Sequence, residues 1–160
     1  MLYSGDTVVH RAHWGQQALA FAWIRRMGEL AAQDPAKPLC WLLLVKGHRT
    51  YKYLSVFAQR FYPHWQQDEP ALAQLAAQLA TARFGDEFHA DLGIVRFAQA
   101  RGQLLPEYAQ PLASEASKAS TQFFLQRNPG YVHGDELVCL CRVTADNMRP
   151  LARRLFLGQH

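Results

Sequence analysis

The sequence predicts an α/β fold in a single domain over residues 1–160, with a small, largely parallel sheet and helices on both faces. The first observation is an unbroken apolar run over residues 39–45, because a strand with one face in water would alternate apolar and polar residues. Such runs are typical of strands covered on both sides in a parallel sheet. The second observation is that stretches with helical spacing separate the strand-like runs. The third is the length, which suits one hydrophobic core.

Before the central strand, the sequence predicts one amphipathic helix. Residues 1–7 are compatible either with a short lead-in strand or with an irregular start. Within residues 8–32, apolar side chains recur at intervals of three and four, which is the spacing of one helix face. Pro35 and Pro38 then end the helix, because proline has no N–H group to donate.

After the central strand, helical and strand-like patterns alternate. Gly47 begins a turn into a second helix that reaches Phe61, and a third helix runs from Pro70 to about Gly85. The remaining predicted elements are a strand over residues 92–98, a loop over 99–111, a helix over 112–127, a strand over 137–143 and a last helix near Pro150 with Asp146 or Asn147 as its cap.

The basic residues are unevenly distributed along the chain. Seventeen lysine and arginine residues stand against 13 aspartate and glutamate residues, which gives a formal net charge of +4. Between Asp34 and Asp68 there is no acidic residue, although five basic residues lie there. Such a bias suits a phosphate-bearing partner, either a nucleotide, a coenzyme or a nucleic acid. The alternative is a solvated basic face that only aids solubility.

The three cysteines lie inside apolar runs, where cysteine is commonly a small buried hydrophobe. They are Cys40, Cys139 and Cys141. Their spacing matches neither a zinc motif nor a redox motif, so we expect no metal site. No run approaches the ~18 apolar residues that a membrane span needs, so we expect no membrane partner and a cytoplasmic location.

The turn after the central strand is the predicted ligand site. In α/β sheets, ligands bind beyond the carboxyl ends of strands, where a following helix directs N–H groups and a partial positive charge at them. Backbone N–H groups after Gly47 and the side chains of Arg49 and Lys52 would hold a phosphate group. Thr50 would cap the helix or donate its hydroxyl. The candidate cofactor-binding residues are Lys46, Gly47, His48, Arg49, Thr50, Tyr51 and Lys52.

The alternative is an ordinary turn whose basic side chains face water. The spacing around Gly47 matches neither a Walker loop nor a dinucleotide fingerprint. A general anion site is therefore the most that the spacing supports.

Two histidines lie beside carboxylates. His89 lies in the acidic segment 86–91, and His133 closely precedes Asp135 and Glu136. Such groups can perform acid–base chemistry or bind a metal ion. A solvated turn is the favoured interpretation of both.

Two other classes of function stay open as alternatives. Basic and aromatic residues interleave between His48 and Trp65, as in a nucleic-acid-binding surface, although that partner is less favoured than a small phosphate-bearing ligand. Exposed aromatic side chains, among them Trp14, Trp65 and Tyr108, would instead belong to the surface of a partner complex or a homo-oligomer.

Three segments between residues 41 and 143 resemble the later half of the GCN5-related N-acetyltransferase fold. They are the strand and turn over residues 41–52, the strand over 92–97 and the helix-to-strand passage over 119–143. In that passage, Ala119, the pair Phe123–Phe124 and the pair Gly130–Tyr131 follow the family's order of alanine, aromatic pair and glycine–aromatic residues.

This resemblance implies the binding of acetyl-CoA or a related phosphate ligand. In the family, backbone N–H groups of the turn after the fourth strand bind the pyrophosphate of acetyl-CoA, which corresponds here to residues 47–52. The family's turn usually carries two glycines at fixed spacing, whereas this turn has Gly47 alone. The segment from Lys46 to Tyr51 is also similar to a segment of uncharacterised bacterial proteins, a likeness that implies no activity.

The resemblance also implies an acyl-CoA-dependent N-acyltransferase. Phe124 stands where many members carry a tyrosine that protonates the departing thiolate, which leaves Tyr131 as its replacement. Glu136, His133 or His89 would take a proton from the acceptor amine, directly or through water. Tyr131, His133 and Glu136 are therefore the candidate catalytic residues.

Overall fold

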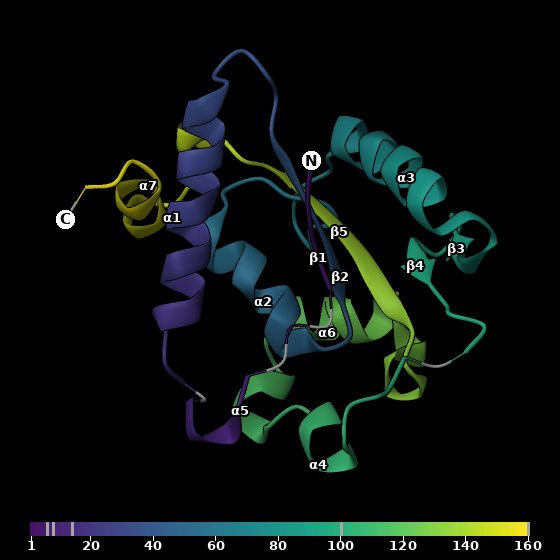
Figure 1. Ribbon diagram of the computed structural model, residues 1–160. Coiled ribbons are helices and arrows are strands. Elements are labelled where there is room, and N and C mark those ends of the chain that lie inside the picture. Colours follow the sequence, from purple (N-terminus) through teal and green to yellow (C-terminus); the bar gives the residue numbers. More distant parts are fainter. Residues whose placement is uncertain (6, 8, 14, 100, 160) are drawn as a thin grey trace.

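A five-stranded sheet lies at the centre of the residues that the structure describes. The computed structural model describes residues 1–5, 7, 9–13, 15–99 and 101–159. The strands lie in the order β1-β2-β5-β4-β3 across the sheet (Figure 1). Their bounds are Leu2–Ser4 for β1, Cys40–Val45 for β2, Phe88–His89 for β3, Ile94–Val95 for β4 and Glu136–Arg142 for β5.

The sheet is mixed and mostly antiparallel, so the prediction of a largely parallel sheet is wrong. Among the described strands, β1 and β2 are the one parallel pair, whereas the β2–β5, β5–β4 and β4–β3 pairs are antiparallel. The apolar run of β2 correctly indicates burial on both faces, because all six of its residues are buried. Burial on both faces does not fix strand direction, however, since a central antiparallel strand between two helical layers shows the same residue pattern.

Helices cover both faces of the sheet, as predicted. They are α1 (Ala18–Gln33), α2 (His48–Phe57), α3 (Pro70–Phe84), α4 (Pro106–Ala109), α5 (Ala113–Ala116), α6 (Ala119–Arg127) and α7 (Pro150–Phe156). Figure 1 shows α3 on one side of the sheet and α1, α2 and α7 on the other. Leu42 and Leu44 accordingly pack in the core beneath α3, and Trp41, Leu43 and Val45 pack in the core on the other face. Within the described residues, no helix has the length and apolarity to cross a membrane.

The predicted elements differ from the observed ones mainly in the second half of the chain. β1 shows that the first residues form a strand, and α1, α2, α3 and α7 lie in predicted segments. The strand predicted over residues 92–98 is reduced to β4, which begins after Gly93, a residue with a left-handed backbone of φ 67°. The helix predicted over residues 112–127 is divided into α5 and α6, because the backbone of Lys118 is extended. Arg149 precedes α7, in place of the predicted Asp146 or Asn147 cap.

Helices α1 and α7 lie in close contact at Gly28. A Cβ atom at this position would overlap the carbonyl group of Phe156, the last residue of α7. Because glycine has no Cβ, the backbones of the two helices can approach each other closely here. The buried residues Ala152 and Leu155 complete the contact from the side of α7.

We expect Gly28→Ala to destabilise the protein by about 1–3 kcal/mol, the usual cost of overpacking. Helix propensity alone predicts the opposite sign, since alanine is favoured over glycine inside a helix by roughly 0.5–1 kcal/mol. Urea unfolding of both proteins measures the difference. A variant more stable than the wild type would show that α1 and α7 do not make this close contact.

Candidate functional site

The predicted ligand turn lies at the edge of the sheet where β1 and β2 end. Because these two strands are parallel, their carboxyl ends meet at one edge, and α2 begins there at His48 (Figure 1). Strand β5 runs the opposite way, so its first residue, Glu136, lies at the same edge. The structure therefore brings one predicted catalytic residue to the predicted ligand turn.

Lys46 and Glu136 form a largely buried ion pair at this edge. The Nζ atom of Lys46 lies 3.4 Å from Oε1 of Glu136, whose side chain is 1% exposed. The same Nζ donates a hydrogen bond to the carbonyl oxygen of Arg101 at 3.1 Å. The ammonium group of Lys46 thus contacts a carboxylate and a backbone carbonyl group at this edge.

Three contacts around Asp135 fix the start of β5 and with it the position of Glu136. Arg96 forms a bidentate pair with Asp135, with distances of 2.6 Å from Nη2 to Oδ2 and 3.0 Å from Nε to Oδ1. These hydrogen bonds raise the pKa of the Arg96 guanidinium. The buried Asn128 donates its side-chain N–H to the backbone carbonyl of Asp135 at 2.9 Å. Gly130 leaves room for the Asp135 carboxylate, which a Cβ atom would overlap.

A carboxylate of the protein itself lies at the first turn of α2. Oε2 of Glu115, in α5, lies 3.3 Å from Nε2 of His48 and 3.6 Å from Nε of Arg49. Burial would raise the pKa of Glu115, but the hydrogen bond and charge of His48, followed by the charge of Arg49, outweigh burial and lower this pKa. Leu104 packs against Gly47, so that a Cβ there would come within 2.9 Å of its Cδ1. The turn is thus covered, and phosphate binding there stays a prediction.

The other predicted cofactor-binding residues point in different directions. Thr50 and Lys52 are exposed on α2. Tyr51 is 0% exposed, and its hydroxyl donates a 2.7 Å hydrogen bond to the carbonyl oxygen of Pro63. Burial raises the pKa of this hydroxyl. The side chain of Tyr51 therefore belongs to the core, because the helical period places it on the inner face of α2, and its role in ligand binding stays a prediction.

Tyr131 and His133 are the remaining predicted catalytic residues. Tyr131 is buried, and its hydroxyl donates a hydrogen bond to the carbonyl oxygen of Ala109 at 3.2 Å. His133 is exposed in the short 3-10 helix Pro129–His133, before β5. Their catalytic roles stay predictions.

The alternative sites gain little from the structure. Within the described part of the chain, no group of three or more histidine, cysteine, aspartate or glutamate residues is arranged to hold a metal ion. Trp65 and Tyr108 are half-buried rather than exposed, and Trp14 lies outside the described residues. Trp65 stacks on His64, with ring centroids 4.1 Å apart. The cysteines are buried, and burial raises the pKa of Cys141 to about 12.

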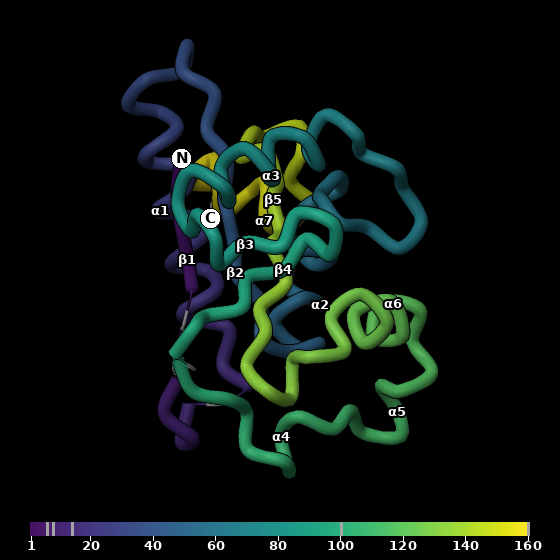
Figure 2. Tube along the Cα trace, turned by 90° about the vertical axis from the view of Figure 1, so that its right-hand side faces the viewer, coloured from purple at the N-terminus to yellow at the C-terminus, as the bar shows by residue number. Residues whose placement is uncertain are grey.

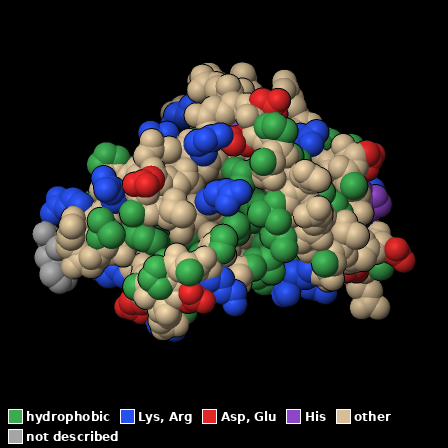
Figure 3. Space-filling model, turned by 90° about the horizontal axis from the view of Figure 1, so that it is seen from above, with side chains coloured by type: hydrophobic (Ala, Val, Ile, Leu, Met, Phe, Trp, Pro, Cys, Tyr) green, Lys and Arg blue, Asp and Glu red, His purple; other side chains and the backbone are tan. Residues whose placement is uncertain are grey.

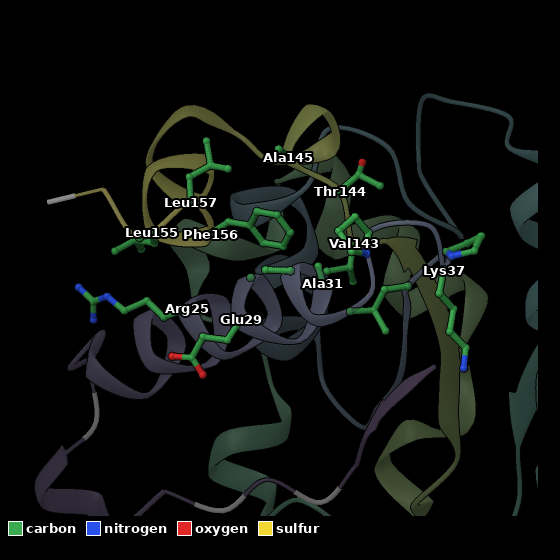
Figure 4. A pocket seen from close by; sticks show the side chains of 16 residues that line it. Arg25, Glu29, Ala31, Lys37, Val143, Thr144, Ala145, Leu155, Phe156 and Leu157 are labelled. Carbon is green, nitrogen blue, oxygen red and sulfur yellow. The ribbon is translucent and has the colours of Figure 1, made fainter.

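A hollow of about 600 Å³ lies elsewhere on the molecule, between α1, α7 and the segments that flank β2 and β5. Its lining is mostly apolar. Figure 4 shows Arg25 and Glu29 at one end of the hollow and Lys37 at the other. Seen from above, hydrophobic side chains gather along the centre of the molecule, and lysine and arginine side chains lie around them (Figure 3). None of the predicted site residues lines this hollow.

Sequence reasoning missed Glu115 and Arg96. Glu115 lies 67 positions from His48, and Arg96 lies 39 positions from Asp135, so neither pair is visible in the order of residues. One weak signal was available, because Glu115 is the single acidic residue within the helix predicted over residues 112–127.

We expect Tyr51→Phe to lower the free energy of unfolding by about 1–3 kcal/mol, because the carbonyl group of Pro63 would lose its hydrogen bond inside the core. Tyr53→Phe is the matched control, since Tyr53 is 45% exposed, and should change this free energy by less than about 0.5 kcal/mol. Chemical denaturation measures both variants. Equal effects would mean that the Tyr51 hydroxyl is not bonded in the core.

The contacts of Glu115 predict a pH-dependent stability. Its pKa in the folded protein lies below the ordinary value of 4.5, so folding favours the charged carboxylate, and the resulting stabilisation is fully present above about pH 4.5. This stabilisation is lost as the pH falls through the lower, folded-state pKa. The difference in Tm between wild type and Glu115→Gln should therefore shrink as the pH falls from neutrality to about pH 3. A difference that is the same at every pH would contradict the lowered pKa.

Comparison with known proteins leaves the family open. No protein-family model, curated protein sequence or solved structure matches the chain. The likeness to acetyltransferases therefore rests on the sequence segments alone and stays a prediction.

Proposed function

We propose that the chain is an acetyltransferase-like protein that binds an acyl-CoA, or another phosphate-bearing ligand, where β1 and β2 end. The observation that carries this proposal is the parallel β1–β2 pair, with α2 beginning directly after β2. At such an edge, the first N–H groups of a helix have no partner inside the helix, and the helix dipole adds partial positive charge.

The phosphate groups of the ligand are assigned to the first turns of α2. The Arg49 side chain is 43% exposed and Lys52 is exposed, so both cations can meet a ligand from solvent. Both extend from the helix that starts at this edge, and they add charge to its N-terminus. Coenzyme A is the ligand that the resemblance to acetyltransferases implies.

The acyl transfer is assigned to Glu136. The nitrogen of an acceptor amine attacks the thioester carbonyl carbon, the carbon–sulfur bond breaks, and the thiolate leaves. Glu136 takes the proton that the nitrogen loses and returns it to the thiolate, so that the proton balance closes. Lys46 holds Glu136 in place through the 3.4 Å ion pair. The step as proposed does not use Tyr131, whose hydroxyl donates a hydrogen bond to the carbonyl oxygen of Ala109.

Thermal unfolding with coenzyme A and acetyl-CoA tests the proposal. A ligand that binds only the folded protein stabilises it by about 2.7 kcal/mol at a hundredfold excess over Kd, so the Tm should rise with ligand concentration. In the double variant Arg49→Ala/Lys52→Ala this rise should be lost or strongly reduced, because the charges that hold the phosphates are gone.

The matched control is Lys37→Ala/Arg153→Ala, which removes two positive charges from the segment before β2 and from α7. Its ligand-induced rise in Tm should equal that of the wild type. No rise at millimolar ligand, or an equal rise in both double variants, would refute binding at the turn after β2.

A further inference from the structure

We propose that residues 101–116, here called the strap, close the ligand turn in the ligand-free protein, and that the Glu115 carboxylate takes the place of a ligand phosphate. This inference rests on the proposed function, because it concerns how that same site is regulated. A ligand would then bind in competition with the protein's own carboxylate. In both Figure 1 and Figure 2, α4 and α5 lie below the sheet, at the end where β1 and β2 finish.

Three contacts fasten the strap to successive residues of the turn. At its start, the carbonyl oxygen of Arg101 accepts a 3.1 Å hydrogen bond from Lys46. Next, Leu104 packs on Gly47. At its end, Glu115 contacts the imidazole of His48 at 3.3 Å and the guanidinium of Arg49 at 3.6 Å. Every residue from Lys46 to Arg49 is therefore contacted by the strap.

The strap itself is only lightly packed on the rest of the protein. Leu105 and Leu112 are each 59% exposed, and Ala109 is the one buried residue among residues 101–116. Its two helices, α4 and α5, have four residues each, which is too short to be stable without tertiary contacts. Segments with few buried apolar contacts open at low free-energy cost.

The charges explain why Glu115 would compete with a phosphate. The cationic side chain of Arg49 and the N-terminus of α2 attract an anion, and Glu115 supplies one from within the chain. The side chain of His48 is 3% exposed. Its Nδ1 atom has no hydrogen-bond partner among the described residues, and its Nε2 atom contacts the Glu115 carboxylate. A ligand phosphate at this turn would be repelled by the negative charge of Glu115 and would need the same hydrogen-bond donors. The phosphate must therefore displace the Glu115 carboxylate to bind.

Glu115→Gln tests the competition, because it removes the charge and keeps the shape. Calorimetry with pyrophosphate and with coenzyme A should show binding at least about fivefold tighter than in the wild type, the lower end of typical coupling between sites. Hydrogen exchange of peptides within residues 101–116 should be faster in this variant. Leu104→Ala loosens the strap without changing charge and should also tighten binding, which keeps the test valid if Glu115→Gln fails to fold.

Glu107→Gln is the matched control, since Glu107 is an exposed carboxylate on the same strap. It should bind both ligands as the wild type does and leave exchange unchanged. If the wild type binds and neither Glu115→Gln nor Leu104→Ala binds more tightly, the strap is overturned and the proposed function stands. If no protein binds either ligand, the proposed function fails and the competition fails with it. If hydrogen exchange of residues 101–116 is equally fast in Glu115→Gln and Glu107→Gln, Glu115 does not hold the strap on the turn.

Discussion

The antiparallel pairing of β2 with β5 is the contact on which the rest of the structure depends. Its six residue pairs run from Cys40–Arg142 to Val45–Leu137. β2 and the first six residues of β5 are buried, so successive side chains of each strand enter the two opposite helical layers. A shift of one residue would exchange these two sets and turn every side chain to the other face. The hydrophobic cores on the two faces of the sheet can therefore form together only in the observed register of β2 and β5.

The same register assembles the candidate site. Lys46 follows the last residue of β2, and Glu136 is the first residue of β5. The pairing of Val45 with Leu137 therefore brings the side chains of Lys46 and Glu136 together at the sheet edge. The free energy needed to remove two charges from water cancels much of the free energy gained from their attraction. Such a pair therefore contributes little to stability. Asp135, held by Arg96, keeps the edge in place.

The sequence predicted the parts of the fold that local pattern controls. Apolar spacing and the prolines located α1, α3 and α7, and the unbroken apolar run located β2 and its burial. Strand direction could not be predicted, because it depends on how distant segments meet. The turn after β2 lies at the carboxyl end of that strand, as the sequence predicts, whereas ligand binding there stays a prediction. The contacts of Leu104 with Gly47 and of Glu115 with His48 could not be predicted, since they come from a segment without a strong periodic pattern. Residue order carries no record of such contacts.

The spatial order of the strands has a consequence for synthesis on the ribosome. β5 lies between β2 and β4, yet it is the last of the described strands to be translated. Until it emerges, β1 with β2 and β3 with β4 are separate two-stranded ribbons, which are marginally stable in water. The apolar side chains of β2 are therefore without their main pairing partner until Glu136–Arg142 have been synthesised.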